Sequence, residues 1–349
     1  MESIRQTRHR LGQGLVIPAC PLALNAERKL DERRQRALFR YYLAAGAGGL
    51  AVGVHTTQFA IHNPQVGLLR PVLELAAAET RQAPALIRIA GLCGPTPAAL
   101  AEAALARELG YHAGLLSLGA LSTASEDELM THCRLISETI PIIGFYLQPA
   151  VGGRVLSGQF WRRLAGLENL VAIKIAPFNR YQTLDVVRAI METGREDVAL
   201  YTGNDDNIVM DLLTPFSWRV DGRMVERRMV GGLLGHWAVW TRQAVALHAE
   251  CRRLVQSRAP IPVELLQRAV EVTDANAAIF DAAHGFAGCI PGIHEILRRQ
   301  GLLEGTWCLD DRETLSPGQR EEIERVCILY PHLNDDAFVQ AHRDQWLAG

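Results

Sequence analysis

Lys174 and Tyr146 are the two residues whose types and spacing point most directly to chemistry. Lys174 interrupts the apolar run LVAIKIA at 170–176, which predicts a buried strand. Only one other lysine, Lys29, is present, and the rest of the 36 Lys plus Arg are arginines. Arginine stays protonated in proteins, whereas a desolvated lysine can lose its proton and attack a carbonyl. The retained lysine therefore indicates an amine that works as a nucleophile.

Tyr146 lies near the end of the apolar run at 142–147, 28 residues before Lys174. Adjacent strands lie about 4.8 Å apart, so inward-facing residues at equal heights can place a phenol beside an amine. A neutral lysine adds to a ketone to give a carbinolamine and then an imine, and a hydroxyl must move protons in both steps. Two plainer interpretations stay open: a lysine buried in a structural ion pair, and a core tyrosine bonded to a backbone carbonyl.

A hydroxyl-rich segment follows the second predicted strand, where the chain reads VHTTQ at 54–58. Thr56 is a candidate relay hydroxyl, and the backbone amides of Thr56 and Thr57 are a candidate cradle for a carboxylate. The alternative is that a threonine at this position caps a helix.

Two further segments carry candidate binding groups. His236 and Trp237 follow the last predicted strand, where a polar and an aromatic side chain either shape a sugar or aromatic pocket or pack under the next helix. Asp205 and Asp206 follow Gly203, and they either bind substrate or cap a helix at 207–214.

The elements that must position these residues alternate between strands and helices. Strands are expected at 14–18, 49–54, 85–90, 113–117, 142–147, 170–175, 198–201 and 230–235. Amphipathic stretches of helical period separate most of them, for example 31–45, 96–109, 125–139, 157–167 and 183–193. This rhythm predicts an α/β fold, a (β/α)8 TIM barrel over residues 1–240. An open doubly wound sheet is the rival, but no Gly-x-Gly-x-x-Gly follows the first strand.

Residues 241–349 read as a C-terminal helical extension packed on the barrel. Helices are expected there at 242–257, 261–280, 288–300 and 316–330.

The bulk composition excludes several classes of protein. The chain has 349 residues, is 48% hydrophobic and carries a formal net charge of −2, so no basic excess points to nucleic acid. No apolar run approaches the roughly 20 residues that span a bilayer, and the first ten residues lack the apolar region of a signal peptide. Seven scattered cysteines suit reduced thiols in the cytoplasm, and neither they nor the 11 histidines form a metal-binding pattern. We therefore expect no metal and no cofactor.

Several segments together resemble the dihydrodipicolinate synthase / N-acetylneuraminate lyase family of class I, Schiff-base aldolases. The resemblance covers nearly the whole chain, and the paired Tyr146 and Lys174 are its most specific part. The other matching segments are IPACPL at 17–22, GAGGLAVG at 46–53, YTGNDD at 201–206 and PGIHEILRRQG at 291–301. The resemblance implies an imine with a 2-oxo acid such as pyruvate, Tyr146 as proton relay, and a carboxylate held by the loop after the second strand. It also implies the barrel with C-terminal helices and a tetramer built from dimers. In sugar-acid members, acids at the positions of Asp205 and Asp206 bind substrate hydroxyls.

Three departures separate the sequence from the pattern of the synthases. In the loop that usually reads Gly-(Ser/Thr)-Thr-Gly-Glu, Thr57 stands for glycine and Gln58 for the acid, and His55 replaces a small hydroxyl residue. Residues 117–122 lack the second tyrosine of the synthases, and residues 235–237, Gly-His-Trp, replace a small glycine-serine segment. These changes argue against lysine biosynthesis but leave imine chemistry in place.

The sequence therefore predicts a cytoplasmic Schiff-base lyase, an aldolase or a dehydratase, that acts on a sugar-derived 2-oxo acid. In this hypothesis Lys174, Tyr146 and Thr56 are catalytic. The residues expected to bind the substrate are Thr57, Gly203, Asp205, Asp206 and His236. The expected assembly is a homotetramer or homodimer, with no nucleic-acid or membrane partner. The alternative is a catalytically silent barrel that binds or senses a small metabolite.

Overall fold

A computed structural model describes residues 3–348 of the chain. Eight parallel strands follow the order β1-β10-β7-β6-β5-β4-β3-β2, and β1 also bridges to β2 through Ala19 and Ala51. This is the strand order of a (β/α)8 barrel, so the predicted fold class is confirmed. The strands are β1 (Val16–Pro18), β2 (Gly49–Val52), β3 (Ile87–Leu92), β4 (Ala113–Leu116), β5 (Ile142–Leu147), β6 (Leu170–Ala176), β7 (Ala199–Thr202) and β10 (Met229–Leu234).

The chain divides into two compact units, and the boundary expected near residue 240 stays a prediction. The first unit contains residues 3–15 and 87–233, and the second contains residues 16–86 and 234–348. The split thus groups the first two strands and their helices with the C-terminal helices.

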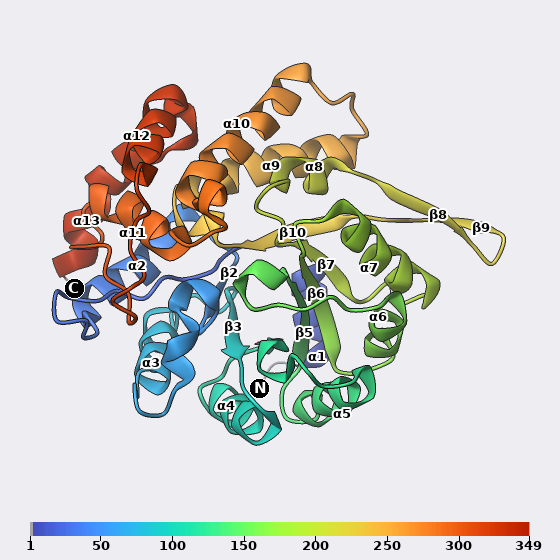
Figure 1. Cartoon of the computed structure of the whole chain (residues 1–349). Helices are drawn as coiled ribbons and strands as arrows, with labels where there is room; N and C mark the ends of the chain where they lie inside the picture. Colours follow the sequence, from blue (N-terminus) through green and yellow to red (C-terminus); the bar gives the residue numbers. More distant parts are fainter. Residues whose placement is uncertain (1–2, 349) are drawn as a thin grey trace. The chain divides into compact units, whose positions relative to one another are not determined.

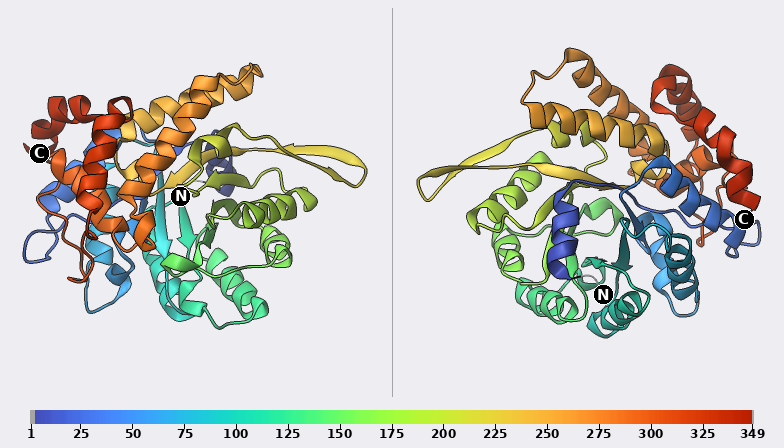
Figure 2. Two further views of the ribbon diagram at one scale, coloured as in Figure 1. Left: turned by 45° about the horizontal axis from the view of Figure 1, so that its top comes forward. Right: turned by 180° about the vertical axis from the view of Figure 1, so that it is seen from behind.

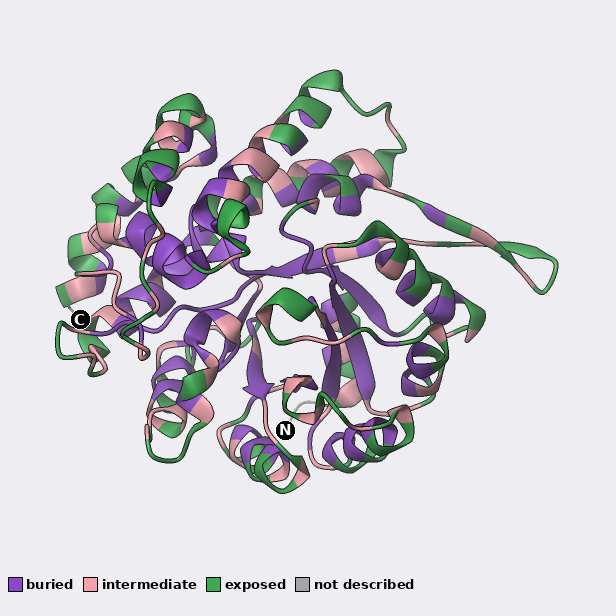
Figure 3. Cartoon of the chain, in the orientation of Figure 1, coloured by how far each residue is buried: buried purple, intermediate pink, exposed green. Residues whose placement is uncertain are grey.

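The first unit carries β3 to β7 and β10, with most of its helices on the outside of these strands (Figure 1). Its helices are α1 (Ile4–Gly12), α4 (Thr96–Glu108), α5 (Glu126–Ser137), α6 (Gly158–Ala165), α7 (Arg180–Glu192) and α8 (Ile208–Leu213). Local sequence explains where several begin: Ser125 and Glu128 form a capping box at the start of α5, and Ser157 caps α6. Most residues of the barrel strands are buried, whereas the helices alternate between buried and exposed faces (Figure 3).

A β-hairpin in the first unit was not predicted from the sequence. Strands β8 (Phe216–Val220) and β9 (Arg223–Arg227) form a separate antiparallel sheet that reaches past α7 (Figure 2). Asp221 and Gly222 make its turn with φ of 47° and 79°. An Asp-Gly pair with both φ values positive is the preferred two-residue hairpin turn, so the signal was present in the sequence.

The second unit carries β1, β2 and most of the remaining helices. These are α2 (Glu32–Ala45), α3 (Leu69–Glu79), α9 (Thr241–Ser257), α10 (Val263–Ile279), α11 (Cys289–Arg299), α12 (Gln319–Leu329) and α13 (Asp336–Ala348). The four predicted C-terminal helices correspond to α9 to α12, within three residues at each end. Within residues 3–348, no helix has both the length and the apolar character needed to cross a membrane.

Candidate active site

Lys174 lies in the fifth position of β6, a strand in which every residue is buried. Its own exposed fraction is 7%. In the parallel register Lys174 is paired with Phe145 of β5 on one side and with Tyr201 of β7 on the other. Residues paired in this way project from the same face of a sheet, so Phe145 and Tyr201 are the nearest cross-strand neighbours of the lysine.

The surroundings of the amine favour its neutral form. Burial lowers the pKa of Lys174 from 10.5 to about 8, and the negative charge of Asp205 opposes this shift. The ring of Phe145 lies 4.5 Å from Nζ, an apolar wall with only a weak attraction for the charged form. Among the described residues, no hydrogen bond fixes the Lys174 amine. A lysine with a pKa near 8 has a substantial neutral fraction at physiological pH, which nucleophilic attack requires.

Gly203 makes room for the lysine side chain. A Cβ at this position would lie 2.6 Å from Cε of Lys174 and 2.7 Å from Cβ of Ala176, closer than carbon atoms approach. Gly203 was predicted as a substrate-binding residue, and the structure gives it a steric reason to lack a side chain. It keeps open the space into which the amine extends.

Asp205 and Asp206 differ in environment although they are adjacent in the chain. Asp205 is 5% exposed and acts electrostatically on Lys174, whereas Asp206 is exposed. Of the two predicted acids, only Asp205 is therefore tied to the amine by a described interaction.

A buried hydrogen-bond network fixes the segment between Gly203 and Asp205. Asn204 Nδ2 donates to Asp211 Oδ2 over 2.9 Å, and its Oδ1 accepts from the backbone amide of Phe178. Asp211 is fully buried, accepts a 2.7 Å bond from Thr202 Oγ1 and pairs with Arg180 over 2.5 Å. The network joins the ends of β6 and β7 through α8, and Asp211 is the ion-pair partner of Arg180 in it.

The structure corrects the expected neighbour of Lys174. Tyr146 is paired with Ile175, so alternation along β5 directs it to the opposite face from Phe145 and Lys174. Its ring packs 5.1 Å from that of Trp161 in α6, and its hydroxyl accepts a 3.3 Å bond from the amide of Leu156. Tyr146 thus makes the contacts of a core tyrosine, and its role as proton relay stays a prediction.

The predicted loop after β2 belongs to the second unit, where both threonine hydroxyls are already bonded. Thr56 Oγ1 donates to the carbonyl of Ala19 and Thr57 Oγ1 to that of Cys20, each over 2.7 Å. Thr57 Oγ1 also accepts from the amides of Gly53 and Val54, as a residue that caps a turn does. Only Thr57 makes a capping contact, and the relay and carboxylate roles of Thr56 and Thr57 remain predictions.

Gln58, which replaces the acid of the family pattern, has a left-handed backbone with φ of 69°. Its side-chain oxygen accepts a 2.5 Å bond from the amide of Leu309, so the residue tethers a C-terminal segment to this loop.

His236 also belongs to the second unit, where it is 6% exposed and follows β10 directly. Nδ2 of Asn276 lies 3.3 Å from Nδ1 of its ring. Burial lowers the pKa of His236 to about 4, which keeps the imidazole neutral at physiological pH.

Comparison with known proteins identifies the family. A model of the dihydrodipicolinate synthetase family matches residues 13–215, more than half of the chain. The chain belongs to this family. A 4-hydroxy-tetrahydrodipicolinate synthase from Bifidobacterium longum strain NCC 2705 is 27% identical over 196 residues, which cover 55% of this chain and 60% of the relative. The match thus spans less than two thirds of that curated relative.

Solved structures of the dihydrodipicolinate synthase family share the fold over nearly the whole chain. The synthase from Oceanobacillus iheyensis superposes with a TM-score of 0.74 at 18% identity, over 94% of this chain and 99% of its own. A prophage protein of the family from E. coli K12, solved with pyruvate, gives a TM-score of 0.72 at 16% identity, over 92% and 98%. At this level of identity the similarity extends to the fold alone.

Three residues of the candidate site around Lys174 were not predicted from the sequence. Phe145 would have required knowledge of the strand register, which no local pattern reveals. Asn204 lies in the segment YTGNDD, and Asp211 lies a few residues after it. The single acid in the apolar helix α8 could have indicated that Asp211 is buried and needs a polar partner.

Proposed function

We propose that the protein forms a Schiff base between Lys174 and a 2-oxo acid and acts as a carbon–carbon or carbon–oxygen lyase. The observation that carries this proposal is the buried amine of Lys174 with its lowered pKa, beside an apolar ring and a glycine that leaves it space. Family membership supports the proposal, as does a relative solved with pyruvate.

The chemistry follows from the neutral amine. Nζ of Lys174 adds to the C2 carbonyl of the 2-oxo acid, and the carbinolamine then loses water to give an imine. For carbon–carbon cleavage, the C3–C4 bond breaks and its electron pair moves toward the protonated imine to give an enamine, while the C4 hydroxyl loses its proton and the C4 fragment leaves as a carbonyl compound. For carbon–oxygen cleavage, C3 loses a proton to give the enamine, which then expels the C4 hydroxyl as water with a proton from the site. Protonation of the enamine at C3 in the first case, and hydrolysis of the imine in both, release the 2-oxo acid product and restore the amine.

Proton transfer in these steps requires an acid–base group. Asp205 is the carboxylate that acts on Lys174 within the first unit, so we assign it proton transfer or contact with a substrate hydroxyl. A hydroxylated, sugar-derived 2-oxo acid is the substrate class that suits an acid at this place. We also propose a homotetramer or homodimer in the cytoplasm, in keeping with the family resemblance and with seven cysteines that form no disulfide within residues 3–348.

Trapping of the imine tests the proposal. The protein is incubated with a panel of pyruvate and longer hydroxylated 2-oxo acids, reduced with borohydride and mapped by peptide mass spectrometry. An adduct on Lys174 with at least one acid, absent from Lys174→Arg, is expected. Absence of any adduct on Lys174 across the panel would contradict the proposal.

A catalytically silent barrel that binds a small metabolite is the second candidate. The specific observation in its favour is the placement of Phe145 beside the amine while Tyr146 packs against Trp161. If this candidate holds, a 2-oxo acid raises the melting temperature of the wild type and of Lys174→Arg equally, and no product forms. Loss of the stabilisation in Lys174→Arg would contradict it.

A further inference from the structure

An aromatic cavity of about 290 Å³ lies entirely within the second unit. It is bounded by the turn after β10, by helices α9 and α10, and by the turn before α13. An apolar cavity of about 150 Å³ is enough to hold benzene, so this volume admits one or two fused rings. The lining residues that matter for the argument are His236, Trp237, Trp240, Ala244, Glu250 and Arg268.

Trp240 is held in this wall by an unusual backbone conformation. Its φ of 52° and ψ of 35° are left-handed, a region that bulky side chains rarely adopt and that costs about 1–2 kcal/mol. The start of α9 is fixed by two buried groups, because the Tyr41 hydroxyl accepts from the amide of Thr241 and Asp335 accepts from that of Arg242. Strain at a residue whose surroundings enforce it is commonly found where the side chain has a functional position.

The cavity lining also carries polar side chains, and the two formal charges among them cancel; these residues are His236, Gln243, Glu250, Arg268 and His332. Arg268 of α10 pairs with Glu250 of α9 over 3.0 Å, and these side chains are 36% and 33% exposed. They therefore mark the side of the cavity that solvent reaches. His236, on the buried side, is neutral at physiological pH because burial lowers its pKa. Aromatic walls with a small number of fixed polar groups are the usual composition of small-molecule sites.

We infer that this cavity is a second ligand site, which binds an uncharged planar aromatic or heteroaromatic molecule with a hydrogen-bonding edge. The ring of the ligand packs against the indoles of Trp240 and Trp237, in offset or edge-on contact. Its polar edge meets the Glu250–Arg268 pair, whose balanced charge disfavours a ligand with a net charge. The site is independent of the imine chemistry proposed for Lys174.

The binding test uses indole and benzamide as probes, with benzoate as the charged counterpart of benzamide. Saturation-transfer NMR on the full chain detects binding, and quenching of tryptophan fluorescence gives dissociation constants. Saturable binding of indole or benzamide, tighter than that of benzoate, is expected. Absence of saturation transfer from both uncharged probes, or preference for benzoate, would overturn the inference.

Variants locate the bound probe. Trp240→Asn removes the indole but retains a residue that tolerates the left-handed region, so the backbone is preserved. We expect binding to weaken by about tenfold or more because ring contacts are lost. Arg258→Asn is the matched control, since Arg258 ends α9 with the same φ of 52° but does not line the cavity. Equal affinity of Trp240→Asn and the wild type would overturn the assignment.

Two further variants test whether the probes bind in this cavity and not at Lys174, and whether a loss of binding has a cause other than unfolding. Ala244→Leu fills the cavity from α9 while Trp240 itself is retained, and it should abolish binding while the chain stays folded. Lys174→Arg should bind both probes as the wild type does. Binding that survives in Ala244→Leu, or that disappears in Lys174→Arg, would place the probes elsewhere and contradict the proposal.

Discussion

At the scale of single residues, the chemistry rests on the environment of one amine. Lys174 is surrounded by buried strand residues, with Phe145 on one side and Gly203 leaving space on the other. Its type and its strand were predictable, because a lone lysine in an otherwise arginine-rich chain and an apolar run are both visible in the sequence. Its lowered pKa follows from that burial.

Tyr146 gives a prediction that separates two roles. In the structure its hydroxyl accepts one bond from the amide of Leu156, so Tyr146→Phe should lower the free energy of unfolding by about 0.5–1.5 kcal/mol. Imine trapping should change little. A proton relay would instead contribute roughly 10²–10⁴-fold to the rate, so Tyr146→Phe would slow trapping by about that factor. Rapid-quench borohydride trapping decides between the outcomes, with Lys174→Arg as the blank.

Gly203 gives a second prediction at this scale. Gly203→Ala places a Cβ 2.6 Å from Cε of Lys174, too close for two carbon atoms, so the lysine side chain must move. We expect trapping at Lys174 to fall sharply, with a stability loss of about 1–3 kcal/mol from overpacking. Gly12→Ala, at an exposed position with open space and no positive φ, controls for the general cost of a glycine replacement. Unchanged trapping in Gly203→Ala would show that the amine does not need this space.

At the scale of elements, the strands were predicted well and their relative register was not. The run at 142–147 matches β5 residue for residue, yet the register between β5 and β6 shifts between Ile142 and Ile143. A shift of one residue exchanges the two faces of a strand, so Phe145 takes the place expected for Tyr146. Such an irregularity depends on packing between distant segments and leaves no local signal in either strand.

Elements whose ends are set by local sequence could have been predicted, even where the sequence analysis did not name them. Helix α1 begins with a capping box made by Ser3 and Gln6, and the β8–β9 hairpin turns at Asp221 and Gly222. The network around Asp211 could not be predicted from local sequence, because it joins residues from β7, α7 and α8 that only the fold brings together.

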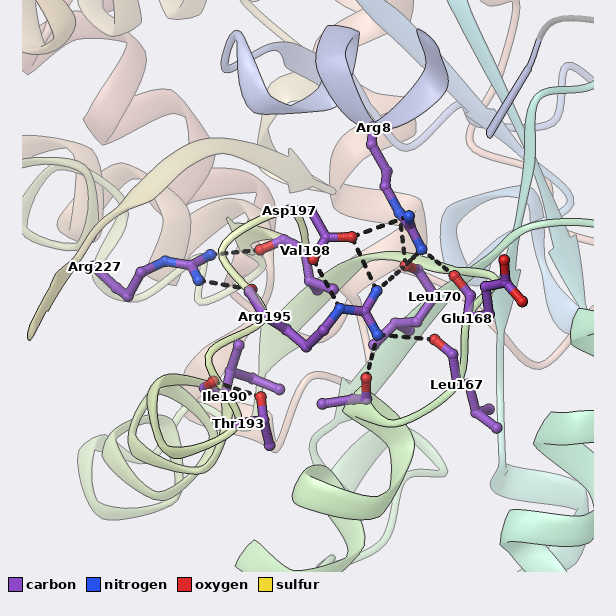
Figure 4. A network of polar contacts seen from close by, with 11 residues as sticks. Arg8, Leu167, Glu168, Leu170, Ile190, Thr193, Arg195, Asp197, Val198 and Arg227 are labelled. Atoms are coloured by element: carbon purple, nitrogen blue, oxygen red, sulfur yellow. Dashed lines mark hydrogen bonds and ion pairs between the residues drawn. The ribbon is translucent and has the colours of Figure 1, made fainter. Parts of the chain in front are cut away.

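At the scale of the whole molecule, the strong preference for arginine has a structural use in the first unit. Arg195 donates to the carbonyls of Ala165 and Leu167 and pairs with Asp197, which also binds Arg8 (Figure 4). Arg227 in turn donates to the carbonyls of Arg195 and Val198. One guanidinium serves several acceptors in fixed directions, which an ammonium group cannot do.

Arg195→Lys tests this role of arginine. The variant keeps the positive charge but loses the planar guanidinium group with its several N–H donors. We therefore expect the free energy of unfolding to fall by about 2 kcal/mol. Arg188→Lys is the matched control: its side chain is 52% exposed and pairs only with Asp185 among the described residues, so its change should stay within about 0.5 kcal/mol. Denaturant unfolding of both variants measures the difference, and equal stabilities would contradict the role of the network.

The central claim, that Lys174 is a nucleophilic amine, is tested most directly by the pH dependence of imine trapping. The neutral fraction grows as the pH rises through the pKa, so trapping at saturating borohydride should increase and reach half its maximum near the pKa of about 8. Lys174→Arg, treated in the same way, is the blank for adducts elsewhere in the chain. An adduct on Lys174 with a midpoint near pH 8 is the predicted result, whereas a midpoint near the ordinary lysine value of 10.5 would contradict the account.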